Sequence, residues 1–129
     1  MQYISTRGKT QPMQFSDVLL MGLAPDGGLM LPETYPSIDE ATLQKWRNLS
    51  YSELAFEIMS LFVTDIAADD LKNIMNKTYT KAAFGSEDIT PVTRLYDRLA
   101  LLELSNGPTL AFKDIAMQFL GNAFEYVLK

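Results

Sequence analysis

The segment from Gly107 to Asp114 contains the residues of this sequence that could do chemistry. It reads Gly-Pro-Thr-Leu-Ala-Phe-Lys-Asp, and it places Lys113 where a rigid turn gives way to an expected helix. A neutral lysine amine is a nucleophile toward carbonyl groups, and partial burial or nearby positive charge favours the neutral form. Because most of its sequence neighbours are apolar and a helix start carries positive partial charge, Lys113 could be desolvated and reactive. The alternative is a solvated surface lysine, which is the commoner situation.

Three neighbours of Lys113 could support its chemistry. Thr109 carries a hydroxyl group that can bond a ligand or cap a helix, and Phe112 offers an aromatic face. Asp114 either orients Lys113 or places a negative charge at the start of the helix, and the second role is the simpler one.

The composition of the whole sequence excludes several classes of functional site. The 129 residues include no cysteine and no histidine, which excludes disulfides, Cys/His zinc sites and His-dependent nucleophiles. Sixteen acidic and eleven basic residues give a net charge of −5, and no basic run with interleaved aromatics appears. A nucleic-acid partner is therefore disfavoured. The N-terminus lacks the apolar core of a signal peptide, and no run reaches the roughly eighteen apolar residues that span a bilayer. We therefore expect a cytoplasmic protein without a membrane partner. Its partner is expected to be a small molecule.

The lysine segment closely resembles the pyridoxal-phosphate lysine motif of the threonine synthase family. The resemblance covers residues 104–114 and continues in residues 118–121. Residues 3–8 are similar to the opening strand and loop of the same family, and residues 22–29 with 32–33 are similar to its following turn. The order and spacing of the three blocks agree along the whole chain.

The resemblance implies a cofactor, a substrate and a role for each candidate residue. Lys113 would bind pyridoxal 5'-phosphate as a Schiff base and would move protons once the substrate amine has displaced it. Phe112, Thr109 and Asp114 are the further candidate cofactor contacts. The family converts O-phospho-L-homoserine and water into L-threonine and phosphate. Asn106 stands where many relatives have histidine, and an amide does not titrate near neutral pH, so no acid-base role is assigned to it.

The resemblance also implies that these 129 residues are the N-terminal part of a longer enzyme. Threonine synthases are several times longer, and no glycine-rich loop that could cradle the cofactor phosphate appears in this sequence. We expect that loop, and the groups that hold the cofactor ring, to follow Lys129. We expect the chain alone to be inactive.

Periodicity and turn residues predict an α+β N-terminal domain over residues 1–84, mostly helical with short strands. Residues 85–129 are expected to begin an α/β fold-type II pyridoxal-phosphate domain with its first strand-helix segment, cut short. The boundary falls in the Gly85-Ser86-Glu87-Asp88 stretch, the clearest compositional break. The expected strands cover residues 1–6, 29–31, 92–96 and 99–104, and the expected helices cover residues 16–23, 37–47, 50–62, 69–81 and 115–128.

Caps and apolar faces give further detail for these helices. Ser16-Asp17 is expected to cap the first helix, and Ser37 with Glu40 and Ser50 with Glu53 fit capping boxes. The residues expected to be buried are Ile38, Leu43 and Trp46 in the second helix, Leu54, Ile58, Leu61 and Phe62 in the third, and Leu71, Ile74 and Met75 in the fourth.

Two weaker sites and two alternative functions stay open. Residues 5–8 (Ser-Thr-Arg-Gly) could contact a phosphate or could be a plain strand end, and residues 26–28 (Asp-Gly-Gly) fit a tight turn. The chain could belong to a threonine-synthase-like protein that acts on another phospho-amino acid, or it could be a non-catalytic helical interaction module, which Asn106 favours. Because residues 115–128 are apolar around most of the helix, we expect the chain alone to self-associate there.

Overall fold

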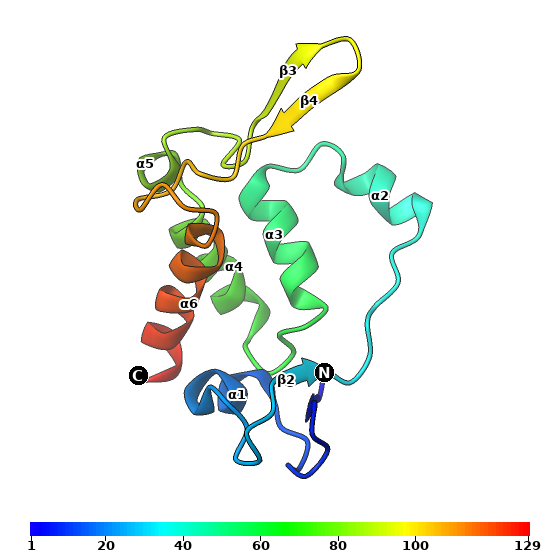
Figure 1. Ribbon diagram of the computed structural model, residues 1–129, viewed down its shortest axis with the longest axis vertical. Coiled ribbons are helices and arrows are strands. Elements are labelled where there is room, and N and C mark those ends of the chain that lie inside the picture. Colours follow the sequence, from blue (N-terminus) through cyan, green and yellow to red (C-terminus); the bar gives the residue numbers. More distant parts are fainter.

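The computed structural model of the protein describes all residues from 1 to 129. The elements follow in the order β1 (Tyr3–Ser5), α1 (Phe15–Met21), β2 (Met30–Pro32), α2 (Glu40–Trp46), α3 (Tyr51–Ser60), α4 (Ala68–Thr78), α5 (Lys81–Phe84), β3 (Val92–Tyr96), β4 (Leu99–Leu102) and α6 (Asp114–Val127). Helices α3, α4 and α6 lie side by side, with α1 and the β1–β2 pair across one end and the β3–β4 hairpin projecting from the other (Figure 1). The structure is a small α+β fold, as the sequence predicts.

The hydrophobic core lies where α4 packs between α3 and α6. The buried residues of this core are Leu19, Val63, Ile66, Leu71, Ile74, Met75, Phe119 and Ala123. Helix α4 buries Leu71, Ile74 and Met75, which confirms the apolar face predicted from its periodicity. Helix α6 is held in the core by Phe119 and Ala123, so the start of α6, where the candidate lysine lies, has a fixed position.

All four predicted strands are present, and they form two two-stranded antiparallel sheets, β1 with β2 and β3 with β4. In the first sheet Tyr3 lies opposite Pro32 and Ser5 opposite Met30. The second is a hairpin that turns at residues 97–98, with a register shift between Arg94 and Tyr96. Such a bulge increases the local twist, which explains how a tight turn without glycine can close. Strand β4 ends at Leu102, two residues before the predicted end.

Two of the predicted helix caps are wrong. Helix α1 begins at Phe15, so Ser16 lies inside the first turn, and its backbone N–H donates to the Asp65 carboxylate from a distant loop (2.8 Å). In α2 the cap is Asp39, whose carboxylate accepts from the Thr42 N–H at 2.8 Å, and the predicted box that starts at Ser37 does not form. Aspartate is at least as good a capping residue as serine, and Asp39 directly precedes the first residue of α2.

The predicted burial of α2 is also wrong, because this helix makes no extensive contact with another helix or strand. No residue of α2 is buried, and Ile38 and Leu43 are 38% and 48% exposed. Figure 1 shows α2 set apart from the other helices.

Helix α3 has the predicted capping box between Ser50 and Glu53, but a different face packs on the core. Its core-facing residues are Ala55, Phe56 and Met59. Ile58, which was predicted to be buried, is 37% exposed. Apolar residues cover more of the circumference of α3 than one face, and the position of α4 decides which of them are buried.

The predicted helix over residues 69–81 corresponds to α4, which ends three residues earlier than predicted and is followed by a separate short helix. Helix α4 ends at Thr78, and the Thr80 hydroxyl accepts from the Ala83 N–H to start the short helix α5. Gly85 ends α5 with φ +71°, a conformation that glycine adopts without steric cost. None of the helices in the chain combines the length and the apolarity that a membrane crossing requires.

Candidate functional site

Lys113 is the residue immediately before α6, with φ −65° and ψ −17°, so the lysine lies at a helix start as predicted. Its side chain is exposed, so of the two alternatives that the sequence leaves open for this lysine the structure has the solvated one. None of the three ion pairs of the chain includes Lys113. The amine is therefore accessible and free of a carboxylate partner.

An open apolar pocket lies beside this lysine. It has a volume of about 460 Å³, and its wall is made by Met59, Tyr79, Leu104, Phe112, Lys113, Ile115, Ala116 and Phe119. Lys113 is the one charged residue on that wall. A pocket of this size and lining is typical of small-molecule sites, in which a few polar groups orient an apolar ligand. The arrangement can present one amine to a planar, mostly apolar molecule.

Tyr79 fixes the α6 side of this pocket. Its hydroxyl donates to the Ile115 carbonyl oxygen at 3.0 Å and so ties the end of α4 to the start of α6. Burial, with a smaller contribution from the neighbouring Tyr51, raises the pKa of Tyr79 to about 12. The hydroxyl therefore keeps its proton and its hydrogen bond at neutral pH.

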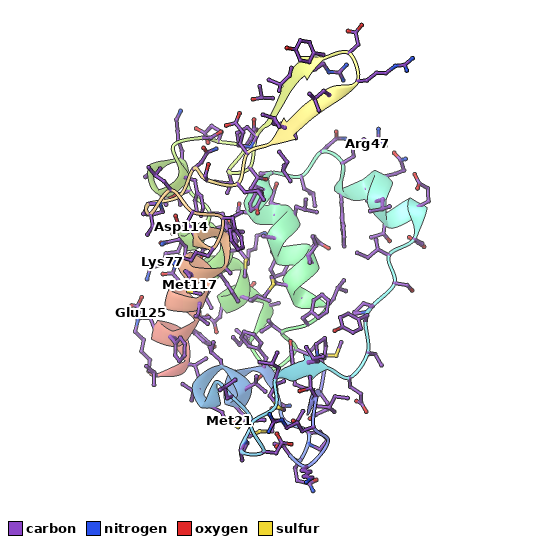
Figure 2. All side chains as sticks on the ribbon, in the orientation of Figure 1. Met21, Arg47, Lys77, Asp114, Met117 and Glu125 are labelled. Atoms are coloured by element: carbon purple, nitrogen blue, oxygen red, sulfur yellow. The ribbon has the colours of Figure 1, made fainter.

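Asp114 and Thr109 bond to each other. The Asp114 carboxylate accepts from the Thr109 N–H and from the Thr109 hydroxyl, both at 2.8 Å, and from the Ala111 N–H at 3.5 Å. Asp114 is 1% exposed, and Figure 2 shows it at the start of α6. Burial alone would raise the pKa of this carboxyl, but the hydrogen bonds from Thr109 and Ala111 and the charge of Lys113 outweigh it and lower the pKa.

Gly107 begins the loop, residues 107–113, that these hydrogen bonds close onto Asp114. It is buried, and a Cβ atom there would lie 2.6 Å from Asp114 Oδ2 and closer still to Asp114 Cβ. The loop carbonyl of Gly107 accepts from the Leu110 N–H at 3.0 Å, and Leu110 has φ +56°. A left-handed conformation at a leucine is uncommon and persists where the surrounding contacts impose it.

The structure thus divides the four candidate site residues into two pairs. Lys113 and Phe112 are exposed and share the pocket wall, and Phe112 is 72% exposed. Thr109 and Asp114 are occupied by each other on the inner side of the loop. A helix-start charge at Asp114 does not imply this bond, and the short spacing between Thr109 and Asp114 is the only sign of it in the sequence.

The two N-terminal motif blocks also meet, at the end of the molecule where α1 and the β1–β2 pair lie (Figure 1). The Ser5 hydroxyl donates to Asp26 Oδ1 at 2.7 Å, and Arg7 Nη1 donates to the Asp26 backbone oxygen at 3.0 Å. The bond from Ser5, with smaller help from the N–H groups of Gly28 and Lys9, lowers the pKa of Asp26 to about 2, although burial opposes the shift. This cluster holds the turn that the sequence predicts at residues 26–28.

A second pocket, of about 160 Å³, lies between α4 and α6. Its charged groups are already paired, Lys77 and Lys129 with Glu125, and Asp70 with the Tyr126 hydroxyl. Figure 2 shows Lys77 and Glu125 on the outer side of the two helices. This pocket lacks a free nucleophile, so the pocket beside Lys113 is the better candidate site.

Comparison with known proteins identifies the family of this chain. A family model described as the threonine synthase N terminus matches residues 2–79. The chain belongs to the threonine synthase family. It is 57% identical to a threonine synthase of Corynebacterium glutamicum over 100% of this chain and 28% of that protein. It is 43% identical to a Xenopus laevis protein named threonine synthase-like 2, again over 100% of this chain and 27% of the relative.

Solved threonine synthase structures have the same fold over this region. A pyridoxal-phosphate-bound threonine synthase of Brucella melitensis matches with a TM-score of 0.93 and 40% identity, over 99% of this chain and 27% of that one. The Escherichia coli threonine synthase matches with a TM-score of 0.84 and 25% identity. The family predicted from the lysine motif and the two N-terminal blocks is confirmed, and the chain corresponds to the N-terminal region, spanning about 28% of such relatives.

Proposed function

We propose that this chain is the N-terminal part of a threonine synthase, a carbon-oxygen lyase acting on phosphates, with pyridoxal 5'-phosphate bound to Lys113. The complete enzyme would convert O-phospho-L-homoserine and water into L-threonine and phosphate. The observation that carries the proposal is an accessible lysine without a carboxylate partner, at a helix start and beside an apolar pocket, in a chain of this family. We propose a role in threonine biosynthesis and a cytoplasmic location for the complete enzyme.

The residues present fit the reactive part of this cofactor. The Lys113 amine can reach an aldehyde without first breaking an ion pair, and the apolar wall suits a planar ring. The wall has no further charged residue for the phosphate group, which we assign to parts of the enzyme after Lys129.

Within the reaction, this chain would supply a proton carrier and a water-excluding surface. When bound, the cofactor acts as an electron sink for negative charge on the substrate carbons. Lys113 Nζ, once free again as an amine, would accept and return protons at the substrate, because it is held close to them. Phe112, exposed on the pocket wall, would exclude water from that position.

We also propose that the chain comprises a threonine synthase N-terminal domain over residues 1–84 and the beginning of a fold-type II catalytic domain over residues 85–129. Every residue of the β3–β4 hairpin is exposed, and a two-stranded hairpin alone is marginally stable in water. Its exposed apolar residues are Val92, Leu95, Tyr96, Leu99, Leu101 and Leu102. Such a hairpin fits a larger sheet that the remainder of the enzyme would complete, so the chain alone would be inactive and prone to self-association.

Replacement of the lysine tests the proposed reaction. In the complete protein, Lys113→Ala should abolish phosphate release from O-phospho-L-homoserine while the circular dichroism spectrum stays unchanged. Lys81→Ala is the matched control, because Lys81 is an exposed lysine that pairs with Glu87 outside the pocket. Near-normal turnover by the Lys113 variant would contradict the proposal.

A second candidate function is supported by the 43% identity to a threonine synthase-like 2 protein. The complete protein would then use the same lysine on another phosphorylated amino acid. Turnover of such a compound, with none of O-phospho-L-homoserine, would favour this candidate. A complete protein that neither binds the cofactor covalently nor turns over either compound would favour the non-catalytic interaction module.

A further inference from the structure

We propose that Asp114 is the positioning residue for Lys113: its carboxylate closes the loop from Gly107 to Lys113 onto the start of α6 and fixes the place from which the lysine side chain extends. The proposal rests on the function proposed above for Lys113 and deepens it. It changes the role of Asp114 and Thr109 from candidate cofactor contacts to an internal brace.

The burial of Asp114 is the first observation behind this proposal. Carboxylates are almost never fully buried unless they are paired, and Asp114 is 1% exposed. No lysine or arginine forms an ion pair with it. Its compensation comes from two N–H groups and one hydroxyl group, all donated by Thr109 and Ala111. The carboxylate therefore binds the loop and not the lysine amine.

The position of the groups that donate to Asp114 shows that it does more than place a negative charge at the start of the helix. A carboxylate that stabilises a helix start accepts from the first N–H groups of its own helix or remains in solvent beside them. Asp69, in the first turn of α4, is of the second kind and is exposed. Asp114 accepts from residues three and five positions before it, which lie outside α6.

The brace is anchored at both ends. On the helix side, Phe119 is in the core and the Ile115 carbonyl is held by Tyr79, so α6 does not shift independently. On the loop side, Gly107 packs directly against Asp114, with no room for a side chain. The Cα atom of Lys113 is part of this closed unit, while its side chain is exposed.

The test measures covalent attachment of pyridoxal phosphate to the complete protein. Attachment joins Lys113 Nζ to the aldehyde carbon and releases one water. Borohydride then reduces the resulting carbon-nitrogen double bond, so that the mass of the Lys113 peptide reports the attached fraction at each time. Asp114→Ala should slow attachment by about a hundredfold, the effect of misplacing a reacting group by about 1 Å. Asp69→Ala, which removes an exposed helix-start carboxylate, should leave the rate unchanged.

Asp114→Asn distinguishes geometry from charge. Its amide oxygen can accept from the Thr109 N–H, and its NH₂ group can donate to the Thr109 hydroxyl, so the brace is kept without the charge. We expect attachment close to the wild-type rate, and in turnover we expect Asp114→Ala to lower kcat with little change in KM. Attachment by Asp114→Asn as slow as by Asp114→Ala would overturn the proposal, as would wild-type attachment by Asp114→Ala.

Should Asp114→Ala fail to fold, Thr109→Val keeps the test open, because it removes the hydroxyl bond and leaves the backbone bonds in place. Slower attachment by this variant, with an unchanged circular dichroism spectrum, would support the brace, and an unchanged rate would overturn it. The proposed function fails separately: in that case the wild-type protein shows no modified Lys113 peptide at all.

Discussion

Replacing Gly107 by alanine tests the closed loop at the position where the structure leaves least room. The new Cβ atom would lie 2.6 Å from Asp114 Oδ2 and closer still to Asp114 Cβ, whereas ordinary contacts begin at 3.4 Å. The loop must therefore open by about 1 Å. A rotation of the Asp114 side chain cannot relieve the clash, because its Cβ atom moves only with the backbone. Gly107 does not have positive φ, so the cost comes from packing and not from backbone strain.

Overpacking of this kind costs about 1–3 kcal/mol. Urea unfolding of the chain, followed by circular dichroism at a concentration where light scattering shows one species, should give a loss in that range for Gly107→Ala. Gly121→Ala is the matched control: it lies inside α6, where a Cβ atom meets nothing within 4 Å. Because alanine is the better helix former, that variant should gain about 1 kcal/mol. Equal stability of Gly107→Ala and the wild type would refute the close packing of the loop against Asp114.

Three further predictions concern the helix caps, the N-terminal turn and the exposed hairpin. Ser50→Ala should lower the free energy of unfolding by about 1 kcal/mol in urea, because it removes a formed capping box. Ser37→Ala should leave that free energy unchanged, and equal effects of the two substitutions would contradict the observed caps. The carboxyl of Asp26 has a folded-state pKa of about 2 against an ordinary 3.8. Its contribution to stability is therefore complete above pH 3.8 and is lost as the pH falls through about 2, and Asp26→Asn should remove this part of the acid dependence of unfolding. An identical acid profile in the variant would count against the Ser5 bond. Light scattering on the chain alone should show association that grows with concentration, through the hairpin and the exposed residues of α6, and a monodisperse monomer at high concentration would contradict it.

Local sequence signals predicted the elements that are stabilised locally. The capping box at Ser50 and the apolar stripe of α4 depend on residues three and four positions apart, so the sequence contains all the information needed. The start of α6 at Lys113 was likewise predictable from the turn before it. The choice between Ser37 and Asp39 as the cap of α2 was not predictable, since both are good capping residues and they lie only two positions apart.

The errors arose where a distant contact, or the lack of one, decides the outcome. The first turn of α1 is capped by Asp65, 49 residues away, which no local pattern reveals. The burial expected for α2 requires a covering partner, as would desolvation of Lys113, and within this chain neither is covered. The bond from Thr109 to Asp114 is local but depends on a left-handed leucine, which the sequence does not favour at Leu110.

The proposed function depends on covalent attachment of the cofactor to Lys113 in the complete protein. The most direct measurement is peptide mapping of the complete protein after incubation with pyridoxal phosphate and reduction with borohydride. We expect one modified peptide, which contains Lys113 and is absent from the Lys113→Ala protein. A modification that maps to another lysine, or that persists in the Lys113→Ala protein, would contradict it.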